Sequence, residues 1–257
     1  MHAGPPAIEG LVEEYAVAME NFPYEIVETS GEDALATWEK LKNAGRGTPV
    51  VLGSGIEKYL PTPAQRAQLP TVQDILAVAA TINFPDDFLK FRRDEHAAAI
   101  AHLSEMNLPI GLEDEEYEPP LGEWPTETGP STGLSVLYDY ATRGTRSRVP
   151  IALIPTDDPA DVPAYLHWGD WNACPPPAYH VAALRAWRAQ YGAELVGIAG
   201  DTMNLRVSRK PVTPEEALDL ARVQYVYCND IIDQGVGSYR ALATGLMAHD
   251  WWFFWWD

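Results

Sequence analysis

The chain has 257 residues, of which 37 are acidic and 18 are basic, so its formal net charge at pH 7 is -19. Nucleic acids and anionic membranes bind basic surfaces, so an acidic excess of this size argues against both as partners. The same charge is compatible with a basic protein partner, or with a surface that serves only solubility.

Only two cysteines are present, Cys174 and Cys228. The first residues carry neither the basic region nor the apolar stretch of a secretory signal. No apolar run is long enough to span a bilayer. We therefore expect a cytoplasmic protein with both thiols reduced.

The first half of the chain predicts a loose α/β region. Apolar residues at helical spacing predict a helix over residues 8–20, and alternation predicts a strand over 24–28. A helix over 30–43 and an apolar strand over 49–53 follow, so we expect a βαβ unit with a right-handed crossover. Two further helices are expected, one from Thr71 to Ala79 and one from Asp86 to about Met106.

The composition then changes sharply. Residues 113–130 combine an acidic run with proline, glycine and threonine and show no periodicity. This pattern predicts a solvated, mobile linker, with an acidic partner-binding arm as the alternative. We divide the chain into an N-terminal α/β region (1–112), a linker (113–148) and a C-terminal α+β module (149–257).

The C-terminal module has clearer element signals. They predict a buried strand over 149–155, a helix from the prolines at 175–177 to Tyr191, a strand over 194–199 and a half-exposed hairpin partner over 203–208. Thr213-Pro214-Glu215-Glu216 has the form of a capping box and opens a helix that ends at Cys228. A last helix is expected over 239–247.

The sequence ends in six consecutive aromatic residues, 251–256, followed by Asp257. Such a segment, if exposed, favours aggregation, so we expect it to be a strand packed by rings inside the sheet. The predicted fold class is α/β (α+β): a mixed β-sheet flanked by helices, with the aromatic C-terminal segment as an inner strand.

Several unusual motifs lie in the second half of the chain. They are Trp168-Gly169-Asp170-Trp171-Asn172-Ala173-Cys174-Pro175, His180-Val181-Ala182, Leu184–Trp187, Tyr191–Val196, Gln224-Tyr225, Tyr227–Asp230, Asp233–Gly235 and Phe254–Asp257. With these motifs the chain resembles a bacterial family known as domain of unknown function four-two-five-three, best over residues 149–257. Ala173, Val223 and Asn204 stand where the family pattern leads us to expect acidic residues. The resemblance implies no known activity.

Polar and reactive side chains gather in two of these motifs. We expect them to surround a single concavity as a ligand-binding cluster of Trp168, Asp170, Asn172, Cys174, His180, Cys228 and Asp230. A metal is not expected, because the cysteines and histidines have no standard ligand spacing. No cofactor is expected either, since the Gly53-Ser54-Gly55 turn lacks the rest of a dinucleotide or phosphate-loop motif.

The cluster leaves two readings of its chemistry open. A cysteine with His180 can form a nucleophile–base pair, or His180 can be a structural histidine that is satisfied in the core. We therefore expect an acidic binding protein, such as an inhibitor or immunity-type partner of a basic protein. The alternative is an enzyme or small-ligand binder that uses the polar cluster.

Overall fold

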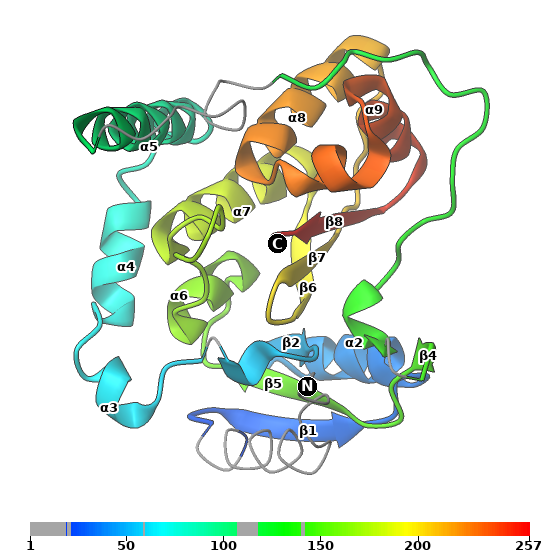
Figure 1. Cartoon of the computed structure of the whole chain (residues 1–257). Coiled ribbons are helices and arrows are strands. Elements are labelled where there is room, and N and C mark those ends of the chain that lie inside the picture. Colours follow the sequence, from blue (N-terminus) through cyan, green and yellow to red (C-terminus); the bar gives the residue numbers. More distant parts are fainter. Residues whose placement is uncertain (1–18, 20–21, 59, 107–117, 140–141) are drawn as a thin grey trace, which may run out of the picture.

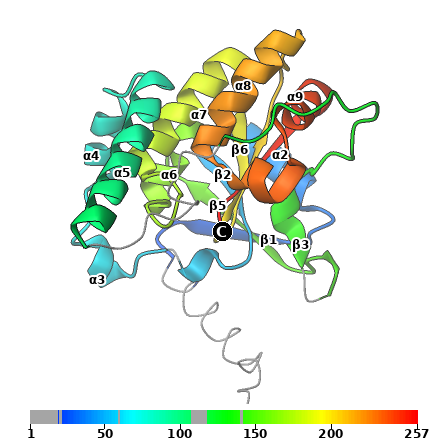
Figure 2. The same cartoon turned by 45° about the horizontal axis from the view of Figure 1, so that its top comes forward.

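A computed structural model of the protein describes residues 19, 22–58, 60–106, 118–139 and 142–257. Its centre is a six-stranded mixed sheet with helices on its sides (Figures 1 and 2), so the predicted fold class is confirmed. In spatial order the strands are β1 (Glu25–Thr29), β5 (Val149–Ile154), β2 (Thr48–Leu52), β6 (Glu194–Ile198), β7 (Thr202–Arg206) and β8 (Trp251–Trp255). A separate two-stranded ribbon joins β3 (Tyr138–Asp139) to β4 (Gly144–Thr145).

Most predicted helices are present. The longer ones are α2 (Ala34–Ala44), α4 (Val72–Ala79), α5 (Asp86–Glu105), α7 (Pro177–Tyr191), α8 (Pro214–Tyr227) and α9 (Tyr239–Ala248). Short helices add α3 (Pro63–Arg66), α6 (Val162–Leu166), η1 (Ile56–Lys58), η3 (Ser135–Leu137), η4 (Pro159–Asp161) and the π-helical turn η5 (Ile231–Val236). The helix expected over 8–20 lies outside the described residues except for Met19. Within the described part of the chain, no helix is both long and apolar enough to cross a membrane.

The expected βαβ unit is present in a split form. Strands β1 and β2 each pair antiparallel with β5, which lies between them, so β1 and β2 run parallel to each other without touching. All residues of β2 and β5 are buried, as suits strands in the middle of a sheet. Strand β5 belongs to the predicted C-terminal module, and its two neighbours belong to the predicted N-terminal region. The two regions therefore share one sheet.

Each face of the sheet carries its own core. Helices α7 and α8 cover the face with the larger core, which includes Trp168, Trp187 and Phe254. Helix α2 and η3 cover the opposite face, where Trp38 packs with Val51. The Trp38 indole N–H donates to the Pro49 carbonyl at 2.7 Å, which fixes α2 against β2.

The aromatic tail forms β8, as predicted, and it lies at the end of the strand order rather than inside the sheet. It pairs antiparallel with β7 along its whole length. Trp252, Phe254 and Trp256 point into the larger core and are at most 2% exposed. The alternate residues are only half-buried. One face of the tail is therefore buried in the larger core and the other face is half-buried.

The threonine caps are confirmed with one difference. Thr71 and Asp74 form a full capping box at the start of α4. Thr213 accepts from the Glu216 amide at 3.2 Å, but the Glu216 carboxylate accepts from the Val212 amide at 2.9 Å instead of the Thr213 amide. The carboxylate thus reaches one residue further back than a capping box requires.

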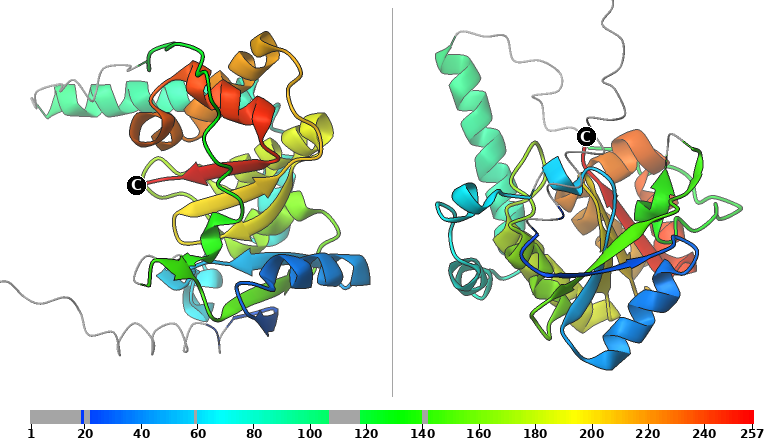
Figure 3. Two further views of the ribbon diagram at one scale, coloured as in Figure 1. Left: turned by 90° about the vertical axis from the view of Figure 1, so that its right-hand side faces the viewer. Right: turned by 90° about the horizontal axis from the view of Figure 1, so that it is seen from below.

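The predicted linker is less free than its composition indicates. Residues 107–117 lie outside the described part, but residues 118–134 run as an extended segment over α9 and past β8 (Figures 1 and 3). The amides of Tyr239 and Arg240 donate to the carbonyls of Pro120 and Leu121 at 3.2 and 3.0 Å. The segment is solvated, as expected, yet fixed to α9. We call residues 118–134 the strap.

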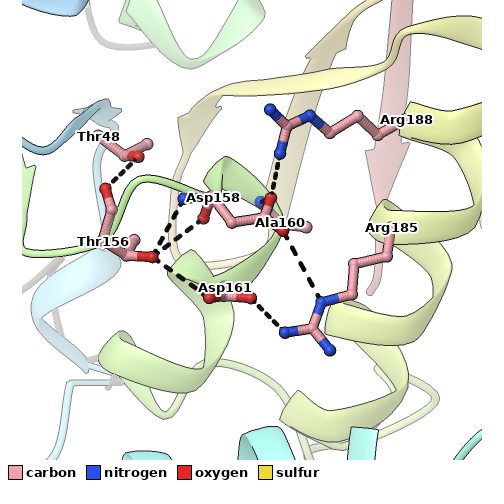
Figure 4. A network of polar contacts seen from close by, with 7 residues as sticks. All are labelled: Thr48, Thr156, Asp158, Ala160, Asp161, Arg185 and Arg188. Carbon is pink, nitrogen blue, oxygen red and sulfur yellow. Dashed lines mark hydrogen bonds and ion pairs between the residues drawn. The ribbon is translucent and has the colours of Figure 1, made fainter. Parts of the chain in front are cut away.

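A polar network holds α7 against the loop after β5 (Figure 4). Arg185 donates to Asp161 at 2.8 Å, and Arg188 donates to Asp158 at 2.5 Å. Thr156 also donates to Asp161, at 3.2 Å. Because both arginines are on α7, the network fixes the rotation of the helix that carries His180.

Candidate functional site

The candidate site lies at the edge of the sheet where β2, β6 and β8 end. Strands β2 and β6 are parallel, and β7 is antiparallel to both β6 and β8, so the carboxyl ends of all three point the same way. Open α/β sheets place ligands at this edge. The loop from α6 to α7 crosses it, with the Trp168 indole N–H donating to the Ala199 carbonyl at 2.9 Å.

That loop has an unusual backbone. His167, Gly169, Asp170 and Asn172 all have positive φ, at 51, 118, 68 and 46°. Gly169 is required, because a Cβ atom there would lie 2.2 Å from the Pro175 carbonyl oxygen and 2.8 Å from the His180 ring. The close approach of this backbone brings Cys174 beside the first turns of α7.

Three buried side chains from separate elements form a hydrogen-bonded row. The Cys174 thiol lies 3.4 Å from His180 Nε2, and His180 Nδ1 lies 2.5 Å from the Tyr227 hydroxyl of α8. Trp168 and Trp256 enclose the imidazole, with ring centroids at 4.9 and 5.6 Å. His180 and Tyr227 have no exposed surface, and Cys174 is 3% exposed.

Burial keeps this row uncharged. Burial, together with the smaller effect of the nearby Arg92 guanidinium, lowers the pKa of His180 to about 3. Burial also raises the pKa of both Cys174 and Cys228 well above the ordinary thiol value. The pKa of Tyr227 is raised for the same reason. At neutral pH the imidazole is therefore neutral and both thiols are protonated, so the row contains no thiolate–imidazolium pair.

The other predicted residues bind the end of β8. The Cys228 thiol donates to the Trp255 carbonyl at 2.9 Å, and the Asn172 amide donates to the Asp257 carbonyl at 3.0 Å. Asp230 accepts from the Asp257 amide at 2.9 Å. These three contacts hold residues 255–257 against the loop and the end of α8.

The structure thus brings most of the predicted cluster to one place. Trp168 and Cys174 each contact His180, while Asn172, Cys228 and Asp230 converge on residues 255–257. Asp170 is exposed on the same loop. Trp168, Cys174, His180 and Cys228 are at most 3% exposed and belong to the core. Among the described residues, no group of three or more His, Cys, Asp or Glu side chains is arranged to hold a metal ion.

Sequence reasoning missed two members of the cluster. Tyr227 precedes Cys228 in a motif, but its contact with His180 needs the packing of α8 on α7. Arg92 of α5 donates to the Ala173 carbonyl and lies over the Phe88 ring at 5.1 Å. It is 81 positions from Ala173 in the chain, and no local pattern marks it.

Asn204, where the resemblance led us to expect an acidic residue, has a structural role on the other face of the sheet. It is fully buried, and its side-chain oxygen accepts from the Val136 amide at 3.0 Å. Its side-chain amide donates to the Ser135 hydroxyl at 2.9 Å. An aspartate could not make the second of these bonds as a donor.

Residues 150–257 match the family model described as Domain of unknown function (DUF4253). The resemblance seen in the motifs is therefore confirmed for this segment, which contains every residue of the predicted cluster and excludes Arg92. Neither the curated proteins nor the solved structures gave a match.

Proposed function

We propose that this is a non-catalytic binding protein whose partner presents a basic surface. The net charge of -19 supports a cationic partner. The buried, uncharged state of the Cys174–His180 row supports a role other than catalysis, because neither thiol is activated as a nucleophile.

The observation that carries this proposal is a group of carboxylates at the carboxyl edge of the sheet. Asp170, Asp201 and Asp257 are exposed there, and Asp230 lies beneath them. Asp201 accepts from the Trp255 indole at 3.2 Å and Asp230 accepts from the Asp257 amide at 2.9 Å, so these two carboxylates contact residues 255–257. Among the described residues, none of the four forms an ion pair.

Carboxylates elsewhere on the protein often have a basic neighbour. Glu194 pairs with Lys42 at 2.5 Å, Glu39 with Arg206 at 3.0 Å and Asp158 with Arg188 at 2.5 Å. The carboxyl edge thus differs from these surfaces in having carboxylates with which no lysine or arginine of the described chain forms an ion pair. A lysine- or arginine-rich partner would supply the missing charge.

The alternative is an enzyme or small-ligand binder that uses the predicted cluster. This geometry gives it less support, because the protons stay on the thiols and the imidazole is enclosed by rings. Catalysis or ligand binding by this cluster would require a movement that exposes Cys174 and His180 to solvent.

The proposal can be tested with a fluorescent peptide of about ten residues in which lysine and alanine alternate. We expect fluorescence anisotropy to show binding that weakens as salt is added. The double variant Asp201→Asn/Asp257→Asn should bind about fivefold to tenfold more weakly, as expected for two lost charge contacts.

The matched control is Glu105→Gln/Glu215→Gln, which makes the same change in net charge at exposed positions near the end of α5 and in the first turn of α8. It should bind nearly as well as the parent protein. An equal loss in both double variants would mean that binding follows net charge alone, and it would contradict a partner site at the carboxyl edge.

A further inference from the structure

A second candidate site lies along the edge of β8 that faces away from β7, under the strap. A cavity of about 370 Å³ opens between the helical hairpin α8–α9, the free edge of β8 and the strap. Its walls include Gln224, Leu242, Leu246, Trp252, Phe253 and strap residues between Pro125 and Thr132. Figures 1 and 3 show the strap passing beside β8 and α9. This volume is within the range of small-molecule sites.

The strap is held on both sides of this cavity. On one side, Arg240 donates through its side chain to the Gly122 carbonyl at 2.8 Å and lies over the Trp124 ring at 5.6 Å. On the other side, His249 Nε2 lies 2.8 Å from the Gly129 carbonyl oxygen. The cavity is therefore a formed space beneath an anchored cover.

Two buried donors in its walls lack partners. Gln224 is 1% exposed and Trp252 is 2% exposed. Within the described residues, neither the Gln224 side-chain nitrogen nor the Trp252 indole nitrogen has a hydrogen-bond partner. Leaving a buried donor unpaired is costly, so native proteins rarely do so without a reason. Both residues line the cavity, so an acceptor oxygen on a bound molecule can supply the missing partner once these side chains turn toward it.

The edge of β8 adds main-chain groups. Asp250 and Trp256 hydrogen-bond toward β7, and inward and outward residues alternate along an antiparallel strand. The main-chain groups of Trp251 and Phe253, which line the cavity, therefore point away from β7. They offer one further donor or acceptor beside the apolar walls.

The lining also indicates the charge of the ligand. The two unpaired donors favour an acceptor oxygen and disfavour a cation. No lysine or arginine of the described chain lines the cavity, and Glu127 does, which disfavours an anion. The remaining walls are mainly apolar or aromatic.

We propose that this cavity binds a neutral, mostly apolar small molecule that presents a carbonyl oxygen to Gln224 and Trp252. This site is separate from the carboxyl edge, and it does not depend on the proposed basic partner.

The test uses 2-naphthamide and 2-methylnaphthalene, which share a ring system and differ in the carbonyl group. Binding to the full chain is followed through the indole N–H signal of Trp252 in ¹H–¹⁵N spectra, assigned with Trp252→Phe. We expect 2-naphthamide to shift this signal and to bind about tenfold more tightly than the hydrocarbon.

The key variant is Gln224→Met, which keeps a similar shape and removes the donor. It should abolish most of the preference for the amide while leaving hydrocarbon binding unchanged. Gln73→Met, at an exposed position of α4, should keep the full preference. If Gln224→Met does not fold, the preference is measured in Trp252→Phe through the side-chain amide signal of Gln224, and it should fall in the same way.

Two results would overturn the proposal. One is the absence of any shift of the Trp252 and Gln224 signals with either compound. The other is an amide preference that is the same in the donor-deleted variant as in the parent protein. Binding of an extended peptide, but of neither naphthalene compound, gives the first result and would assign the free edge of β8 to strand addition instead.

Discussion

The Trp187 ring of α7 lies parallel to the Phe254 ring of β8, with centroids 5.4 Å apart and an interplanar angle of 4°. Both side chains are at most 2% exposed. This contact joins the helix that carries His180 to the aromatic tail, so the tail is part of the core on which the candidate site rests.

Replacing Phe254 with alanine should therefore destabilise the protein strongly. Loss of a buried phenyl ring costs about 3–5 kcal/mol, against a total stability of about 5–15 kcal/mol for a typical domain. Phe253→Ala, on the half-buried face of the same strand, is the matched control and should cost clearly less. Urea unfolding measures both free energies, and equal costs would contradict the one-sided packing of β8.

The sequence predicts this strand because few other structures accommodate six adjacent aromatic residues in a soluble protein. It does not predict the place of β8 at the end of the sheet. Strand order depends on which partners meet in three dimensions, and the pattern within a strand carries no such information. The same limit applies to β5, whose apolar run predicts a buried strand but not its insertion between β1 and β2.

That insertion has a consequence for fragments of the chain. A fragment of residues 149–257 would contain β5 without either of its neighbours, leaving a fully buried strand with two open edges. We expect it to be insoluble or to lack a cooperative thermal transition. The full chain should unfold cooperatively. A fragment that melts cooperatively in calorimetry would show that the C-terminal module folds as an independent domain.

The candidate site was likewise predicted only in part from the sequence. The loop and helix starts bring Asn172, Cys174 and His180 together, as their closeness in sequence predicts. Arg92 and Tyr227 join them through helix packing over long sequence separations. The uncharged state of the cluster also needs the structure, because it follows from burial among Trp168, Trp256 and Tyr227.

The buried imidazole predicts a specific pH dependence of stability. The pKa of His180 is about 3 in the folded protein, against an ordinary value of 6.5. Below pH 6.5 the unfolded chain binds a proton that the folded chain does not, so stability falls as the pH is lowered toward 3. This residue should contribute a slope of up to about 1.4 kcal/mol per pH unit in that window.

The measurement is urea unfolding of the parent protein and His180→Gln at several pH values. The slope should be shallower in the variant by the amount that His180 contributes. His102→Gln, at an exposed position of α5, should leave the slope unchanged. Parallel slopes for the parent and His180→Gln would mean that the imidazole is charged in the folded state.

We infer that the cysteine–histidine row is a protonated part of the core and not a reactive centre. The most direct test is alkylation by iodoacetamide at mildly alkaline pH, followed by mass spectrometry of the intact protein. Burial raises the pKa of both thiols and excludes the reagent, so we expect neither Cys174 nor Cys228 to react in the folded state. Both should react once guanidinium unfolds the chain. Alkylation of Cys174 in the folded protein at the rate of a free thiol would contradict the claim and favour an enzyme.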